Sequence, residues 1–361
     1  MQNMSPENGA INLLRNCADA RPGERLLIAY EAPEYGYFDA ASVGVVTRAA
    51  QSIGLKVDTL DVGFDPDTPQ LSPALRERFN TADIVVFLAR LGDQLRFSEM
   101  PAGKRVVVSF ALSEHQFGSG FANGHHAAFL ALKDAVNRVF HGAGRVRITC
   151  PRGTEITGRP QMNMTSAGDT SVRRFPMSVF TPVPAHSFSG RVALGFLTGT
   201  GSRYYDGYST EFDAPVFARL DQGRLTGFEG QARDVARANA QYDRVAARFG
   251  IDRDFVHSWH AGIHPGCGFP WDMRRNWERW GGAAFGNPRI LHFHTCGAYA
   301  PGEISWNVID PTIEVDGLIL WDRGAFMARR LPGGPEILAQ YPCAEALFQQ
   351  PDTDIGLREA G

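Results

Sequence analysis

Arg25-Leu-Leu-Ile-Ala-Tyr-Glu31 is the stretch that decides the fold of the N-terminal part of the chain. Its continuous apolar run is typical of a strand that is buried on both faces of a parallel sheet. Around it the sequence predicts further elements in this order: a helix over 5–20, a helix over 38–53, a strand over 55–62, a short helix over 71–79, strands over 82–89 and 104–110, and a helix within 124–141. Strands that alternate with helices predict a doubly wound parallel α/β domain over residues 1–145.

The pattern changes near Val146, where short strands separated by turns begin. The sequence predicts hairpins over 215–229 and 312–321, a long helix over 231–249 and a terminal helix over 335–348. Residues 146–361 are therefore expected to form an α+β domain that is rich in antiparallel strands. The first domain has no GxGxxG after its first strand and no GxxxxGK[ST], so a nucleotide site is not indicated.

Bulk composition limits the classes of function. The 361 residues, 43% hydrophobic and 21% charged, suffice for two domains with packed cores. The formal net charge is −3 and the basic residues form no cluster, so we do not expect a nucleic-acid partner. The five cysteines are dispersed without a CxxC pair, which fits a reducing compartment. Without a leader pattern or a membrane-length apolar run, we expect a cytoplasmic protein with no membrane partner.

Histidines are concentrated between Asp254 and Asp310, where five of the ten in the chain fall. His292 and His294 are spaced i, i+2 on an apolar run that is typical of a strand. Alternation would place both rings on one face, within reach of one ion. Neutral imidazole is a common ligand of catalytic transition metals. The alternative is a pair of hydrogen-bonded core histidines, but the three other histidines nearby favour a metal site.

His260 and His264 are spaced i, i+4, yet Gly262 and Pro265 indicate a strand that enters a loop. No Glu follows His260, so the helical HExxH motif is absent. His260 lies deeper in the apolar run and is the preferred third ligand. His264 could be a ligand, a proton shuttle or a substrate contact. His257 alternates away from His260 and is expected to be structural.

Glu303 begins the last apolar run of this region. If it points outward, it is an ordinary solvated carboxylate. If it points inward, it would complete two histidines and one carboxylate, the facial arrangement of mononuclear non-haem iron. Otherwise His260, His292 and His294 would form a three-histidine site, and the sequence leaves both alternatives open.

Three further residues are candidate substrate contacts: Glu155, Arg173 and Arg174. An arginine fork can hold a substrate carboxylate through two parallel hydrogen bonds. The alternative is that these residues belong to ordinary exposed loops.

Four segments of the C-terminal part carry a family resemblance: Gly153-Thr-Glu-Ile-Thr, Phe175-Pro-Met-Ser-Val-Phe-Thr-Pro-Val-Pro, Gly223-Arg-Leu-Thr-Gly-Phe-Glu-Gly, and His292 followed by Tyr299. They resemble segments of the thermophilic metallo-aminopeptidases of the aminopeptidase T and S type. The site pattern is most similar to an offshoot of that family, 2,5-dihydroxypyridine dioxygenase.

The chain departs from the peptidase pattern at the metal-binding carboxylates. Ser178 stands where the peptidases have a ligand Glu, and Glu303 and Ser305 stand near their final His-x-Asp. His260-Ala-Gly replaces Leu-Gly-Glu, and the dioxygenase also has His-x-Gly there. A two-metal peptidase site needs bridging carboxylates. The resemblance therefore implies a single-metal site in this chain.

The resemblance also supplies the ligands unequally. His260 carries over from the dioxygenase, His292 from the peptidases, and Glu303 by rough alignment alone. His294 has no counterpart in the family and is a candidate because of its spacing.

By this resemblance the protein is expected to be a mononuclear non-haem Fe2+ oxygenase that takes a small aromatic or heteroaromatic substrate and dioxygen. His264 or Tyr299 would move protons or orient the oxygen species, and the family implies a homo-oligomer. One alternative is a hydrolase in which a single Zn2+ activates water. Another is a metal-free member that binds a ligand or peptide in the groove.

Overall fold

The computed structural model describes residues 4–161, 171–199, 209–297 and 302–358. The helices in these ranges are α1 Pro6–Ile11, α2 Ala41–Ser52, α3 Pro73–Thr81, α4 Arg90–Gln94, α5 Glu114–Gly118, α6 Gly120–Asn123, α7 His126–Gly142, α9 Ala232–Phe249, α10 Trp277–Ala283, α11 Gly334–Gln340 and α12 Pro342–Gln349. The strands are β1 Arg25–Tyr30, β2 Lys56–Asp61, β3 Ile84–Leu88, β4 Arg105–Ser109, β5 Val146–Thr149, β6 Glu155–Gly158, β7 Arg173–Phe175, β8 Val183–Pro184, β9 Ser189–Thr198, β10 Thr210–Asp221, β11 Arg224–Glu229, β12 Val256–Ala261, β13 Ile290–Thr295, β14 Ile304–Ile309, β15 Thr312–Val315, β16 Leu318–Asp322 and β17 Ala325–Phe326.

The first sheet is parallel and has helices on both faces, as the sequence predicts. In the described part of the chain its strand order is β2-β1-β3-β4-β7, and every pair is parallel. Side chains alternate along β1. Leu26 and Ile28 belong to the core cluster that contains α2, whereas Leu27 and Ala29 belong to the cluster that contains α3. Burial on both faces explains the continuous apolar run of β1, and the doubly wound α/β fold is confirmed.

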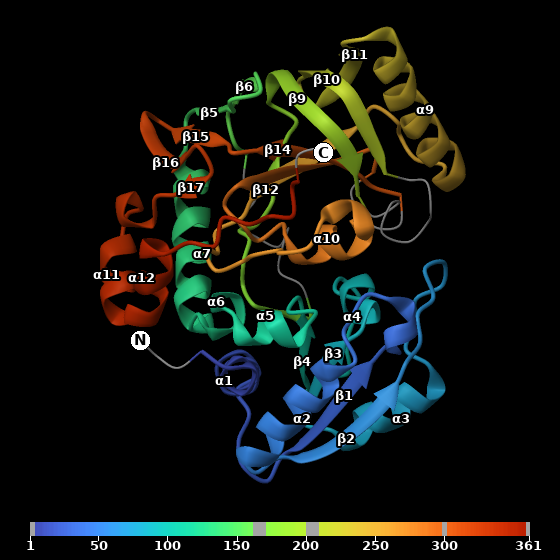
Figure 1. Ribbon diagram of the computed structural model, residues 1–361, viewed down its shortest axis with the longest axis vertical. Helices are drawn as coiled ribbons and strands as arrows, with labels where there is room; N and C mark the ends of the chain where they lie inside the picture. Colours follow the sequence, from blue (N-terminus) through green and yellow to red (C-terminus); the bar gives the residue numbers. More distant parts are fainter. Residues whose placement is uncertain (1–3, 162–170, 200–208, 298–301, 359–361) are drawn as a thin grey trace.

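The second sheet is antiparallel and curls over the first (Figure 1). Over the described ranges its strands run in the order β17-β16-β15-β5-β6-β9-β14-β13-β12-β8, and β10 with β11 extends it from β9. Both predicted hairpins are present, β10 with β11 and β15 with β16. The second hairpin turns at Asp316 and Gly317, which have φ angles of 48° and 87°. The strand-rich second half is therefore confirmed.

The chain path differs from the expected one in two places. Strand β7 pairs with β4 in the parallel sheet, and helix α7 packs in the core of the antiparallel sheet, so the two halves exchange elements across residue 145. The terminal helix is broken into α11 and α12 at Pro342. Proline has no N–H to donate and clashes with the preceding turn, which ends α11.

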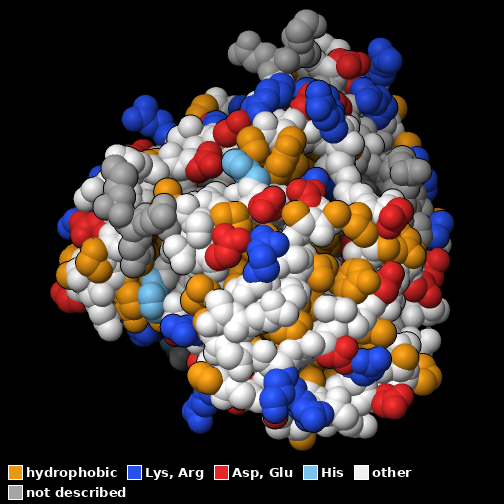
Figure 2. Space-filling model, turned by 60° about the horizontal axis from the view of Figure 1, so that its bottom comes forward, with side chains coloured by type: hydrophobic (Ala, Val, Ile, Leu, Met, Phe, Trp, Pro, Cys, Tyr) orange, Lys and Arg blue, Asp and Glu red, His pale blue; other side chains and the backbone are white. Residues whose placement is uncertain are grey.

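Charged side chains of both signs are interspersed on the face drawn in Figure 2, and the chain has 36 Lys and Arg against 39 Asp and Glu. Within the described ranges the structure has no helix with the length and apolar character needed to cross a membrane.

A buried ion-pair network joins the parallel sheet to α10 through Arg90, the first residue of α4. Its Nε donates to both carboxylate oxygens of Glu31 at 3.1 Å, and its Nη1 donates to Glu278 of α10 at 2.5 Å. The side chains of Arg90 and Glu31 are 3% and 0% exposed. Helix α10 lies between the sheets (Figure 1), so this network positions one wall of the space between them.

We predict that Arg90→Met lowers the free energy of unfolding by about 3–5 kcal/mol, because it removes the guanidinium that compensates the buried charge of Glu31. Arg219→Met is the matched control, because Arg219 pairs with Glu229 on the surface and such pairs contribute about 1 kcal/mol or less. Urea unfolding followed by circular dichroism measures both. Equal losses in the two variants would contradict the role assigned to Arg90.

Candidate metal centre and substrate cavity

Strand pairing brings the predicted histidines together. In the register of β12 with β13, His260 lies directly opposite His292, and Ser258 lies opposite His294. The residues between them, Trp259 and Phe293, face the other side of the sheet and are fully buried in its core. Alternation therefore sends one set of side chains into the core and turns the three imidazoles to a common point.

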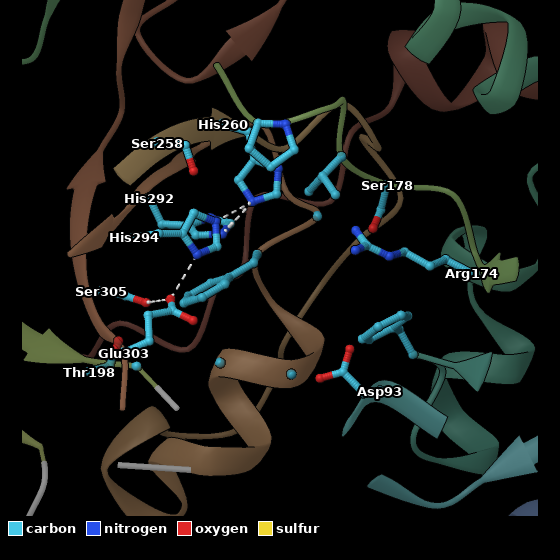
Figure 3. Close-up of a pocket in the computed structure, with 18 of the residues that line it drawn as sticks. Asp93, Arg174, Ser178, Thr198, Ser258, His260, His292, His294, Glu303 and Ser305 are labelled. Carbon is cyan, nitrogen blue, oxygen red and sulfur yellow. Dashed lines mark hydrogen bonds and ion pairs between the residues drawn. The ribbon is translucent and has the colours of Figure 1, made fainter. Parts of the chain in front are cut away.

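The three Nε2 atoms converge (Figure 3). Nε2 of His260 lies 2.6 Å from that of His292 and 3.2 Å from that of His294. Nδ1 of His260 donates to the carbonyl oxygen of Phe180 at 2.9 Å, which leaves Nε2 with a free lone pair. Burial lowers the pKa of His260 and of His292 well below the ordinary value, and the neighbouring imidazoles add to this effect. Both rings are therefore neutral, the form that binds a metal.

The donor set fits one metal ion. Two nitrogens bound to the same ion at about 2.0–2.1 Å lie roughly 2.9–3.4 Å apart. The 3.2 Å separation of His260 and His294 is within that range. The 2.6 Å separation of His260 and His292 would widen by about 0.3 Å. All three ligand atoms lie within 4.8 Å of one another. Imidazole is a ligand for both Zn2+ and Fe2+, so the donors alone do not select between them.

Glu303 points inward, but toward a histidine rather than toward the common point. Its Oε1 lies 2.9 Å from Nδ1 of His294 and accepts a hydrogen bond from the Ser305 hydroxyl at 2.9 Å. A carboxylate in this position helps to orient the imidazole. Of the two alternatives left by the sequence, the geometry favours His294 as the third ligand, with Glu303 holding it.

The histidines line the wall of a cavity of about 320 Å³ between the two sheets. Its other walls come from segments far apart in the sequence, at the carboxyl edge of the parallel sheet and on α10. Five aromatic side chains line it: Phe97, Phe110, Phe121, Trp277 and Phe285. Clefts at the carboxyl ends of parallel strands are the usual ligand sites of open α/β sheets.

The predicted substrate contacts separate into two groups. Arg174 lines the cavity. Arg173, the adjacent residue of β7, projects from the opposite face and pairs with Asp19. Glu155 is exposed, pairs with Arg147 at 2.9 Å and is not among the described residues that line the cavity. The structure therefore brings only Arg174, of these three, to the candidate site in the described ranges.

His264 lies apart from the other histidines, behind the cavity wall. Its ring stacks on Phe129 at 3.6 Å between centroids and meets Phe121 edge-on at 5.1 Å. The side chain is fully buried, and burial lowers its pKa to about 3. It is a neutral core residue and is not among the described residues that line the cavity. Tyr299, the other predicted proton-transfer residue, lies outside the described residues.

His257 lines the cavity, although simple alternation turns it away from His260. The register of β12 shifts between Val256 and Ser258, and a bulge re-aims the side chain at its position. Nδ1 of His257 lies 2.7 Å from the Ser258 hydroxyl oxygen.

Sequence reasoning missed several polar residues that line the cavity. Ser258 and Ser305 alternate with buried tryptophans on β12 and β14, a signal that could have been read from the strands alone. Asp93 and Arg96 also line the cavity. They follow the third parallel strand and reach the site by tertiary packing, so no local pattern indicates them.

The fold and the three histidines define a class: an α/β protein whose antiparallel sheet carries a candidate mononuclear metal centre. No family model and no curated protein matches the chain. Among solved structures, the chain is similar to 2,5-dihydroxypyridine dioxygenase from Pseudomonas putida KT2440, with 13% identity, 91% of this chain and 98% of that chain covered, and a TM-score of 0.60. Wild-type AmpT from Thermus thermophilus aligns at 12% identity over 89% of this chain and 98% of that one, with a TM-score of 0.48. At these identities the likeness to the dioxygenase concerns the fold, and it extends well beyond the C-terminal part that suggested it.

We predict that His260→Ala and His292→Ala each lower the affinity for Fe2+ and Zn2+ at least about 100-fold, because each removes one of three converging nitrogens. His141→Ala, at an exposed position of α7, is the control and should bind metal like the wild type. Metal content after dialysis against a weak chelator measures the effect. Unchanged metal content in both variants would contradict the site.

His264 should make stability depend on pH. Its folded-state pKa of about 3 lies below the unfolded value, so protonation favours the unfolded chain as the pH falls below about 6.5. At pH 5 this costs about 2 kcal/mol. We expect His264→Leu to lose that part of the difference in unfolding free energy between pH 7 and pH 5, whereas His141→Leu keeps it. An unchanged pH dependence in His264→Leu would rule out this role.

Proposed function

We propose that the protein is a mononuclear non-haem iron oxygenase that acts on a small aromatic or heteroaromatic substrate together with dioxygen. The observation that carries the proposal is the convergence of three imidazoles on the wall of an aromatic-lined cavity. The similarity in fold to a dioxygenase, which covers 91% of this chain, is consistent with the proposal.

Each proposed ligand is fixed by a different contact. His260 is held by the Phe180 carbonyl, and His294 is held by Glu303. His292 stacks on Phe285 with 4.1 Å between ring centroids. These contacts hold the rings in place before an ion binds, which is what a catalytic site requires. When bound, ferrous iron would supply the one-electron chemistry that dioxygen activation needs.

The cavity walls favour a planar ring over a peptide. Phe285, which stacks on His292, and Trp277 line the cavity, and such aromatic faces stack with aromatic ligands. A peptide would bury several backbone amide groups against these walls without partners, at a cost of roughly 1–3 kcal/mol for each group. A cavity of about 320 Å³ is at the small end of the range for ligand sites, which is about 300–1,000 Å³.

A single-zinc hydrolase is the second candidate, because three histidines and an open position are also a catalytic zinc arrangement. Hydrolysis needs a general base beside the nucleophilic water. Glu303 is the carboxylate nearest to the histidines among the described residues, and it is engaged by His294 and Ser305. This engagement makes the hydrolase the weaker of the two candidates.

Oxygen consumption tests the proposal. We expect protein loaded anaerobically with Fe2+ to consume dioxygen when dihydroxylated aromatic or pyridine compounds are added. The rate should fall at least about 100-fold in His292→Ala, which loses a proposed ligand. Zinc-loaded protein assayed with amide and peptide substrates is the parallel experiment. Iron-loaded protein that consumes no oxygen and shows no substrate-induced change in its ferrous spectrum would reject the oxygenase, and amide cleavage with zinc would favour the hydrolase.

A further inference from the structure

Two arginine side chains, Arg96 and Arg174, line the cavity. Arg174, the middle residue of β7, projects toward Ser178, across the cavity from His292 and His294 (Figure 3). Arg96 lies close enough to Arg174 for its charge to act on that guanidinium. In both side chains the Nε atom is buried and has no hydrogen-bond partner among the described residues. Buried donors are usually paired, so these two require an explanation.

The two arginines differ in how their charge is compensated. Nη1 of Arg96 lies 3.1 Å from the carboxylate of Asp93 and donates to its carbonyl oxygen at 2.8 Å. No described carboxylate lies within ion-pair distance of Arg174. Burial lowers the pKa of Arg174 to about 10, and the positive charge of Arg96 adds to this. The nearby carboxylate of Asp93, which is paired with Arg96, opposes this shift only in part. The guanidinium of Arg174 is thus a desolvated positive charge that an anion would stabilise.

We propose that the substrate is a monocyclic aromatic acid and that Arg174 binds its carboxylate at the end of the cavity opposite the three histidines. This rests on the proposed function, because the histidines must define the other end of the substrate site. A guanidinium presents parallel N–H groups that match a carboxylate. The aromatic walls between the two ends would hold the ring, and the hydroxyl of Ser178 lies beside the guanidinium (Figure 3).

The chain offers a matched pair of variants. Arg174→Gln removes the charge inside the cavity, whereas Arg173→Gln removes a charge from the opposite face of the same strand, where the side chain pairs with Asp19. Two probes of the same size, 2,5-dihydroxybenzoate and 2,5-dihydroxybenzyl alcohol, differ in the carboxylate. Calorimetry of iron-loaded protein under nitrogen measures binding without turnover.

We expect the wild type and Arg173→Gln to bind the benzoate about 10- to 100-fold more tightly than the alcohol, the range for a hydrogen-bonded charge pair. In Arg174→Gln the two affinities should become equal, and Arg174→Lys should keep part of the preference because it keeps the charge without the fork. If Arg174→Gln does not fold, the proposal is still tested by the preference of the wild type for the benzoate over the alcohol and by the smaller preference expected of Arg174→Lys.

A wild type that binds both probes equally would overturn the proposal. So would a preference that survives in Arg174→Gln, or one that disappears when the metal is removed from the wild type, because the carboxylate would then bind the ion. These outcomes are separable from failure of the proposed function. Oxygen uptake with the alcohol but not with the benzoate would support the oxygenase and reject an aromatic acid as the substrate. A preference for the benzoate that depends on Arg174, without oxygen uptake, would support the carboxylate site and reject the oxygenase.

Discussion

The antiparallel pairing of β12 with β13 is the constraint on which the candidate site depends. It sets His260 opposite His292 on one face and Trp259 opposite Phe293 on the other. A slip of one residue would exchange the two faces, moving the imidazoles into the apolar core and the indole into the cavity. Truncating a buried tryptophan to alanine costs roughly 3–5 kcal/mol. Moving the whole side chain out of the core would cost a similar amount. The packing of the apolar face therefore specifies the geometry of the polar face.

What could be predicted from the sequence follows from this alternation. The parallel strands, the hairpins and the shared face of His292 and His294 each follow from a local sequence pattern, so all three could be predicted. The position of His264 could not be predicted, because its spacing resembles that of a ligand while the chain beyond Gly262 leads it behind Phe121. Asp93 enters the site through packing of one sheet on the other, which no local pattern encodes.

Exclusion of water acts on both ends of the cavity in opposite ways. At one end it keeps His260 and His292 neutral, which preserves the lone pairs that a metal needs. At the other end it destabilises the charge of Arg174, which cannot be neutralised as readily as an imidazole because its ordinary pKa is so high. The same desolvation therefore prepares one end for a cation and the other for an anion.

Charge balance connects these two ends. Under the proposed function, three neutral ligands would leave the charge of a divalent ion uncompensated except by Glu303, which acts through His294. Asp93 is the other carboxylate among the described residues that line the cavity, and it is paired with Arg96. Under the proposal, an aromatic acid would bring a negative charge to the cavity beside Arg174, whose Nε has no hydrogen-bond partner among the described residues.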